Sequence, residues 1–133
     1  MSIKWKTAST NWFMHFCVEV VCFYCLYRLF DGGDYWWIMA ILYDALAFAP
    51  QVVIGEFFEK HPRIKPFPIG GITIIIGAII MVLGENAGTL FFTVELIGLF
   101  FLTIGNGIMH IAGALRTLRV SDGRLSESAI FVG

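Results

Sequence analysis

The sequence predicts an all-α membrane protein, a bundle of helices that cross a lipid bilayer several times. Hydrophobic residues make up 58% of the 133-residue chain and charged residues only 14%, whereas soluble domains carry about 25% charged residues. The mean hydropathy is +0.79. The run 67–84 contains no charged residue, and a membrane-spanning helix needs about 20 mostly apolar residues. We therefore expect a multi-pass protein of the cell membrane whose first partner is the lipid bilayer.

Apolar runs divided by short polar segments predict one transmembrane domain over 1–133. We expect its membrane-spanning helices at about 11–30, 35–58, 67–84 and 89–115. The turn 31–34 (Asp-Gly-Gly-Asp) should end the first helix, because glycine and aspartate favour tight turns. A polar linker over 116–128 leads to 129–133, which begins another apolar run. This restart predicts a truncated chain that stops at the mouth of a fifth helix, with the remaining helices of a longer protein as its partners.

The basic residues predict the orientation of these helices. Eight of the nine lie at the N-terminus, between the second and third runs, or after the fourth run. Because short cytoplasmic loops are enriched in lysine and arginine, we expect the N-terminus to lie in the cytoplasm. The ninth, Arg28, is expected to extend to the outer headgroups. Glu95 lies about two turns from the outer end of its helix and is expected at that rim.

Glycines recur every seven residues on the last two helices. The third helix carries Gly70, Gly77 and Gly84, and the fourth carries Gly98 and Gly105. Seven residues are nearly two helical turns, so each set lies along one face. Small residues let membrane helices approach closely, and the pattern therefore predicts close packing.

Polar residues at membrane depth are the candidate functional residues. Glu19 and Asp44 lie within apolar runs, where an ionised side chain costs about 2.5–3.5 kcal/mol on insertion scales. His15 precedes Glu19 by four residues and shares its helix face, and Asn106 and His110 share a face of the fourth helix. Two interpretations remain open: a substrate cavity in which Glu19 or Asp44 takes up and releases a proton, or hydrogen bonds that only hold the bundle together.

The sequence predicts no enzyme, cofactor, metal site or nucleic-acid partner. Cys22 and Cys25 have the spacing of a metal or redox motif, but no further ligands accompany them, and we expect them to fill helix contacts. His15, His61 and His110 belong to different predicted elements and have no nucleophile beside them. No nucleotide-binding or hydrolytic motif is present.

The segment 55–63 carries the most specific local pattern. It contains a glycine, then three other residues, an acid, a base directly after the acid, and another base after a turn, at Gly55, Glu59, Lys60 and Arg63. This pattern resembles the cytoplasmic signature of the major facilitator superfamily, with glutamate in place of the usual aspartate and Pro62 where glycine is common. The resemblance implies that these residues form a gating loop whose charges control the switch between inward- and outward-open states.

Two further segments resemble the fosmidomycin-resistance type within that superfamily. The histidine-proline loop over 60–68 is similar to the corresponding loop of that group, and 104–110 with Arg116 is similar to its fourth helix, although Ile111 stands where a proline often follows the histidine. The resemblance extends from about Asp44 onward. It implies helices one to four of a twelve-helix transporter with two six-helix halves, which exports a small organic molecule in exchange for protons by alternating access.

Two alternatives stay open at this point. A complete small multidrug-type exporter has four helices and an essential glutamate in its first helix, as Glu19 would be. A membrane subunit without transport activity would need no titrating acid at all. The biased basic residues and the apolar restart at 129–133 favour the facilitator interpretation, which the sequence beyond Gly133 would test.

Overall fold

The computed structural model describes residues 3–30 and 36–121 of the chain. Within these residues the regular elements are all helices, which confirms the predicted all-α bundle. Three helical stretches are long and apolar enough to cross a membrane, namely 36–60, 66–84 and 88–121. These stretches support a membrane-associated protein. The predicted turn at 31–34 and the expected start of a fifth helix at 129–133 lie outside the described residues.

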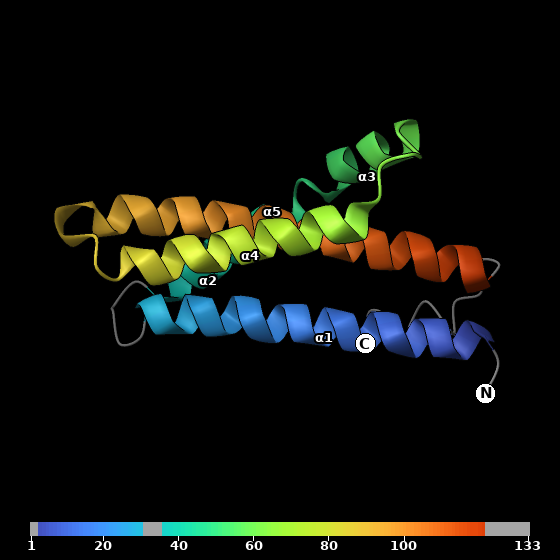
Figure 1. Ribbon diagram of the computed structural model, residues 1–133, viewed down its shortest axis with the longest axis horizontal. Helices are drawn as coiled ribbons and strands as arrows, with labels where there is room; N and C mark the ends of the chain where they lie inside the picture. Colours follow the sequence, from blue (N-terminus) through green and yellow to red (C-terminus); the bar gives the residue numbers. More distant parts are fainter. Residues whose placement is uncertain (1–2, 31–35, 122–133) are drawn as a thin grey trace.

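The first helix, α1 (Ile3–Phe30), runs along one side of the molecule (Figure 1). It begins well before residue 11, where the sequence predicted its start. The prediction marked only the apolar run, but the residues before it are helical as well, and the Thr10 hydroxyl donates to the Lys6 carbonyl at 2.8 Å. Helix α1 therefore extends beyond its apolar part, and it is not among the three stretches that are long and apolar enough to cross a membrane.

The predicted second helix, 35–58, is one apolar stretch over 36–60 that is long enough to cross a membrane, but it is divided into two helices. The chain forms α2 (Trp36–Phe48), a turn, and α3 (Gln51–Lys60). Pro50 lies in the turn, where it has no N–H to donate and cannot continue a regular helix. The Gln51 side chain instead donates to the Ala47 carbonyl at 3.2 Å. As a result α3 diverges from the direction of the other helices in Figure 1.

The last two long helices form the centre of the bundle. Helix α4 (Pro66–Gly84) matches the predicted 67–84, and its proline at the first position needs no hydrogen bond. A short 3₁₀ turn, η1 (Gly88–Leu90), leads into α5 (Phe91–Ser121). The prediction ended this helix at 115, but it continues for a further turn and a half, so the first part of the expected linker is helical. Arginine in the last turn favours this extension, because cations stabilise a helix C-terminus.

The predicted glycine contacts between α4 and α5 are confirmed. A Cβ on Gly77 would lie 2.7 Å from the backbone nitrogen of Leu102, and one on Gly105 would lie 2.8 Å from that of Ile74. Near the start of α4 the contact is with a side chain: a Cβ on Gly70 would lie 2.9 Å from the Met109 side chain. The two backbones are therefore in direct contact.

The core lies where α1, α2, α4 and α5 meet. Its buried members are Cys22, Leu26, Tyr43, Ile74, Met81, Leu99 and Leu102. By contrast, the outer faces of the helices expose large apolar side chains, such as Phe13, Phe16 and Tyr24 on α1. Apolar surface of this extent is unfavourable in water and suits a lipid or protein environment.

Candidate functional site

A row of polar contacts joins α1 to α5. The Asn11 amide of α1 donates to the Thr117 hydroxyl at 2.8 Å and more weakly, at 3.4 Å, to the Gly113 carbonyl. One turn further along α1 lies His15, and one more turn further lies Glu19. Residues four apart share a helix face, so these three side chains all point at α5.

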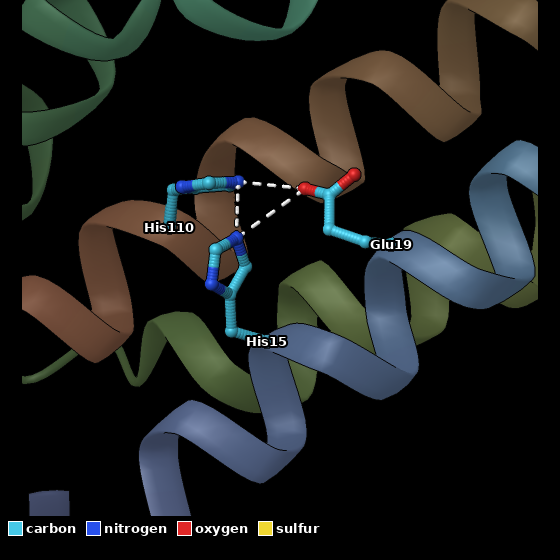
Figure 2. A group of neighbouring side chains, drawn as sticks. All are labelled: His15, Glu19 and His110. Atoms are coloured by element: carbon cyan, nitrogen blue, oxygen red, sulfur yellow. Dashed lines mark hydrogen bonds and ion pairs between the residues drawn. The ribbon is translucent and has the colours of Figure 1, made fainter. Parts of the chain in front are cut away.

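His15, Glu19 and His110 form a compact cluster, which we call the triad (Figure 2). The Nε2 atoms of the two histidines are 3.1 Å apart. Oε1 of Glu19 lies 2.9 Å from Nε2 of His110 and 3.4 Å from Nε2 of His15. The triad side chains are 13–24% exposed, so water or an ion can approach them.

Buried polar side chains support the triad from the interior. The Asn106 amide, one turn before His110 on α5, donates to Oε1 of Glu19 at 3.0 Å and also to the Tyr43 hydroxyl. Both Asn106 and Tyr43 are 1% exposed. The sequence singled out His15, Glu19, Asn106 and His110, and the structure brings all four together. The sequence analysis did not single out Tyr43, because nothing in the apolar run 35–58 marks this tyrosine as a hydrogen-bonding residue.

Asp44 does not join this cluster. Its side chain is exposed on α2, although its neighbour Tyr43 is buried in the core. Successive helical residues point about 100° apart, which explains why one faces inward and the other outward. Asp44 therefore faces away from the described bundle.

Two further charged residues lie near the opposite end of the bundle from the start of α4. Glu95, near the start of α5, is fully buried, and neither carboxyl oxygen has a hydrogen-bond partner among the described residues. Its carboxyl group occupies the space left by Gly84, the last residue of α4, since a Cβ there would clash with Oε1 of Glu95. Arg28 is exposed and pairs with Glu85, with Nη2 and Oε1 3.5 Å apart; its expected extension to the headgroups stays a prediction.

The ion pair found at the predicted gating loop involves Glu56, which is not part of the sequence pattern. Lys60 donates to Glu56 at 2.7 Å, one helical turn away on α3. Glu59 and Arg63 are exposed, and within the described part of the chain they form no ion pair with each other or with Lys60. Gly55, the first residue of the pattern, is half-buried against Ile111 of α5.

His61, the third histidine, is not part of the triad and has a separate structural role. His61 follows α3, and its Nδ1 lies 2.8 Å from the Phe57 carbonyl. Its ring also stacks on the Phe57 ring, with centroids 4.6 Å apart. His61 therefore closes the end of α3.

The triad is the group in the described residues whose chemistry suits a metal ion. Its three ligand atoms all lie within 4.8 Å of one another. The sequence gave no reason to expect this, because His15 and His110 lie on helices at opposite ends of the chain. The fold brings them together by packing α1 against α5.

Comparisons with known proteins give no relationship: no family model matches the chain, and neither does any curated protein or solved structure. The resemblance to the major facilitator superfamily therefore depends on the sequence motifs alone and stays a prediction.

Proposed function

We propose that this chain is part of a secondary active membrane transporter, which exports a small organic molecule in exchange for protons by alternating access. One observation carries the proposal, namely the polar cluster between α1, α2 and α5. Ionisable side chains at membrane depth are costly, and they commonly mark substrate and ion pathways. His15, Glu19, Asn106 and His110 would line the substrate cavity.

Asp44 is the carboxyl group that we assign to proton coupling. It is exposed on α2, within a stretch that is apolar enough to cross a membrane. A carboxylate that faced lipid there would cost about 2.5–3.5 kcal/mol. Asp44 must therefore face a water-filled path or further helices of a larger protein, and a path of this kind is what proton exchange requires.

The arrangement of the helix ends supports an N-terminus in the cytoplasm. The start of α1, the end of α3 and the end of α5 lie toward one end of the molecule (Figure 1). This end carries most of the basic residues, among them Lys60, Arg63 and Arg119. The gating loop would accordingly face the cytoplasm.

The test is transport by the full-length protein in lipid vesicles, measured with a fluorescent organic dye and an imposed pH gradient. Asp44→Asn should abolish gradient-driven accumulation of the dye, because an amide cannot release a proton. Downhill exchange of the dye should persist. Glu85→Gln, which removes an exposed carboxyl in the turn after α4, away from the gating loop and the polar cluster, is the matched control and should transport normally.

Three results would contradict the proposal. Gradient-driven transport that survives Asp44→Asn would exclude this residue as the coupling site. No dye movement by the wild-type protein under any gradient would favour a membrane subunit without transport activity. Loss of transport on Glu19→Gln alone would favour the small multidrug-type exporter.

A further inference from the structure

We propose that the triad of His15, Glu19 and His110 binds one divalent transition-metal ion, of which Zn²⁺ is the best match. The inference goes beyond transport and does not depend on it, because it concerns what the side chains themselves hold. It rests on the positions of three ligand atoms, on the hydrogen bonds available to them, and on their chemical type.

The spacing of the ligand atoms fits a small metal ion. Zinc binds histidine nitrogen and carboxylate oxygen at about 2.0–2.2 Å, most often in a tetrahedral arrangement. Ligand atoms in such a site are about 3.3 Å apart, and those of the triad are 3.1, 2.9 and 3.4 Å apart. At these separations a point about 2 Å from all three atoms exists.

Hydrogen bonds among these three atoms would require one N–H to be shared between two acceptors. Nε2 of His110 faces both Oε1 of Glu19 and Nε2 of His15. An imidazole nitrogen is either a donor or an acceptor, so if it donates to the carboxylate it cannot accept from the other ring. If both histidines direct an N–H at the carboxylate, the two N–H groups oppose each other. A cation bound through three lone pairs removes the conflict.

The ligand types select the class of metal. Two imidazoles and one carboxylate suit zinc and its first-row neighbours, whereas Ca²⁺ and Mg²⁺ prefer sites made wholly of oxygen. Three protein ligands leave a fourth position open to water or another molecule. The amide of Asn106 fixes the Glu19 carboxylate from the interior, which is the role of an outer-shell partner. The ion would tie α1 to α5.

Binding is measured with Co²⁺ alone on the purified, tag-free protein in detergent micelles. Tetrahedral Co²⁺ absorbs strongly in the visible range, and Zn²⁺ should displace it. We expect one Co²⁺ per chain. His15→Ala and His110→Ala should each weaken binding at least tenfold, and Asn106→Ala about tenfold through loss of the outer-shell bond. His61→Ala is the matched control, because His61 only closes α3, and it should bind normally.

His110→Cys keeps the measurement decisive if the alanine variants fold poorly. A cysteine at a ligand position would add a thiolate-to-cobalt charge-transfer band in the near ultraviolet. Its appearance would confirm His110 as a ligand. The proposal is overturned if the wild-type protein shows no saturable Co²⁺ binding, or if His15→Ala and His110→Ala leave the binding unchanged. Neither readout involves transport, so the metal-binding proposal can be disproved without affecting the transport proposal, and the reverse.

Discussion

Two carboxyl groups on the long helices, Glu19 of α1 and Glu95 of α5, have opposite surroundings in this protein. Glu19 is partly exposed and lies within hydrogen-bond distance of Asn106 and His110. Glu95 is fully buried, and the described residues offer its oxygens no hydrogen-bond partner. A buried, unpaired carboxylate is strongly unfavourable, whereas a carboxylate that receives several hydrogen bonds is stabilised. Glu19 therefore belongs to a polar site, whereas Glu95 serves to fill space against Gly84.

Replacement of Glu95 tests this distinction at the scale of one residue. Glu95→Gln keeps the shape of the side chain and never carries a charge. We expect it to leave the free energy of unfolding unchanged or to increase it, as measured by detergent-titrated unfolding of the purified protein. Glu95→Ala is the control for shape. It should destabilise the protein by about 2 kcal/mol or more, because it leaves a cavity.

A clear loss of stability in Glu95→Gln would show that the carboxylate itself is bonded, and it would contradict the space-filling role. Equal stability of Glu95→Ala and wild type would contradict the packing against Gly84.

The sequence predicted which residues belong to the polar cluster, but not that they contact one another. Periodicity places His15 and Glu19 on one face of α1, and Asn106 and His110 on one face of α5. It carries no information on which two faces pack together, since that depends on the fit of side chains and on glycine contacts elsewhere. Tyr43 could not be found for the same reason, because its hydroxyl has a role only once α2 lies beside α5.

At the scale of elements, prediction succeeded where the chain has no charged residues and failed where a proline interrupts an apolar run. The uncharged run of α4 was predicted to within one residue at its start. The break before α3 was not predicted, because membrane helices often continue through a proline when nearby groups satisfy the freed carbonyl. Here α2 ends at Phe48 and α3 begins at Gln51, whose side chain donates to the Ala47 carbonyl at the break. The order of residues alone does not reveal this.

The contact between α4 and α5 predicts a large difference between two glycines of one helix. A Cβ on Gly77 would meet backbone atoms of α5, including the Gly98 carbonyl at 2.9 Å. Backbone atoms cannot rotate away, so Gly77→Ala must push the helices apart and should destabilise the protein by about 1–3 kcal/mol. Gly71→Ala, with nothing within 4 Å, should be neutral or slightly stabilising because alanine favours helix.

The same unfolding titration in detergent measures both variants. Equal effects of the two substitutions would show that the backbones of α4 and α5 are not in contact at Gly77.

The whole molecule has two ends that differ in charge, and this difference predicts its topology. Arg63 lies between α3 and α4 at the basic end, and Asn86 lies in the turn after α4 at the other end. Both side chains are exposed. In a variant without Cys17, Cys22 and Cys25, we expect a cysteine at 86 to react with an impermeant thiol reagent on intact cells.

A cysteine at 63 should react only after the cells are opened. The reverse pattern would place the N-terminus outside and would overturn the proposed orientation. Labelling of both positions from outside would exclude α4 as a membrane span.

Where α4 spans the bilayer, its register against α5 also sets how deep the triad lies in the membrane. Met109 packs on Gly70, four residues from the start of α4 at Pro66 and fourteen from its end at Gly84. With a rise of 1.5 Å per residue, the level of His110 is about 6 Å from one end of this span and about 21 Å from the other. A divalent ion entering from the nearer end crosses about one fifth of the membrane potential. This corresponds to about 1 kcal/mol per 100 mV, so occupancy of the triad from that end should depend only weakly on voltage.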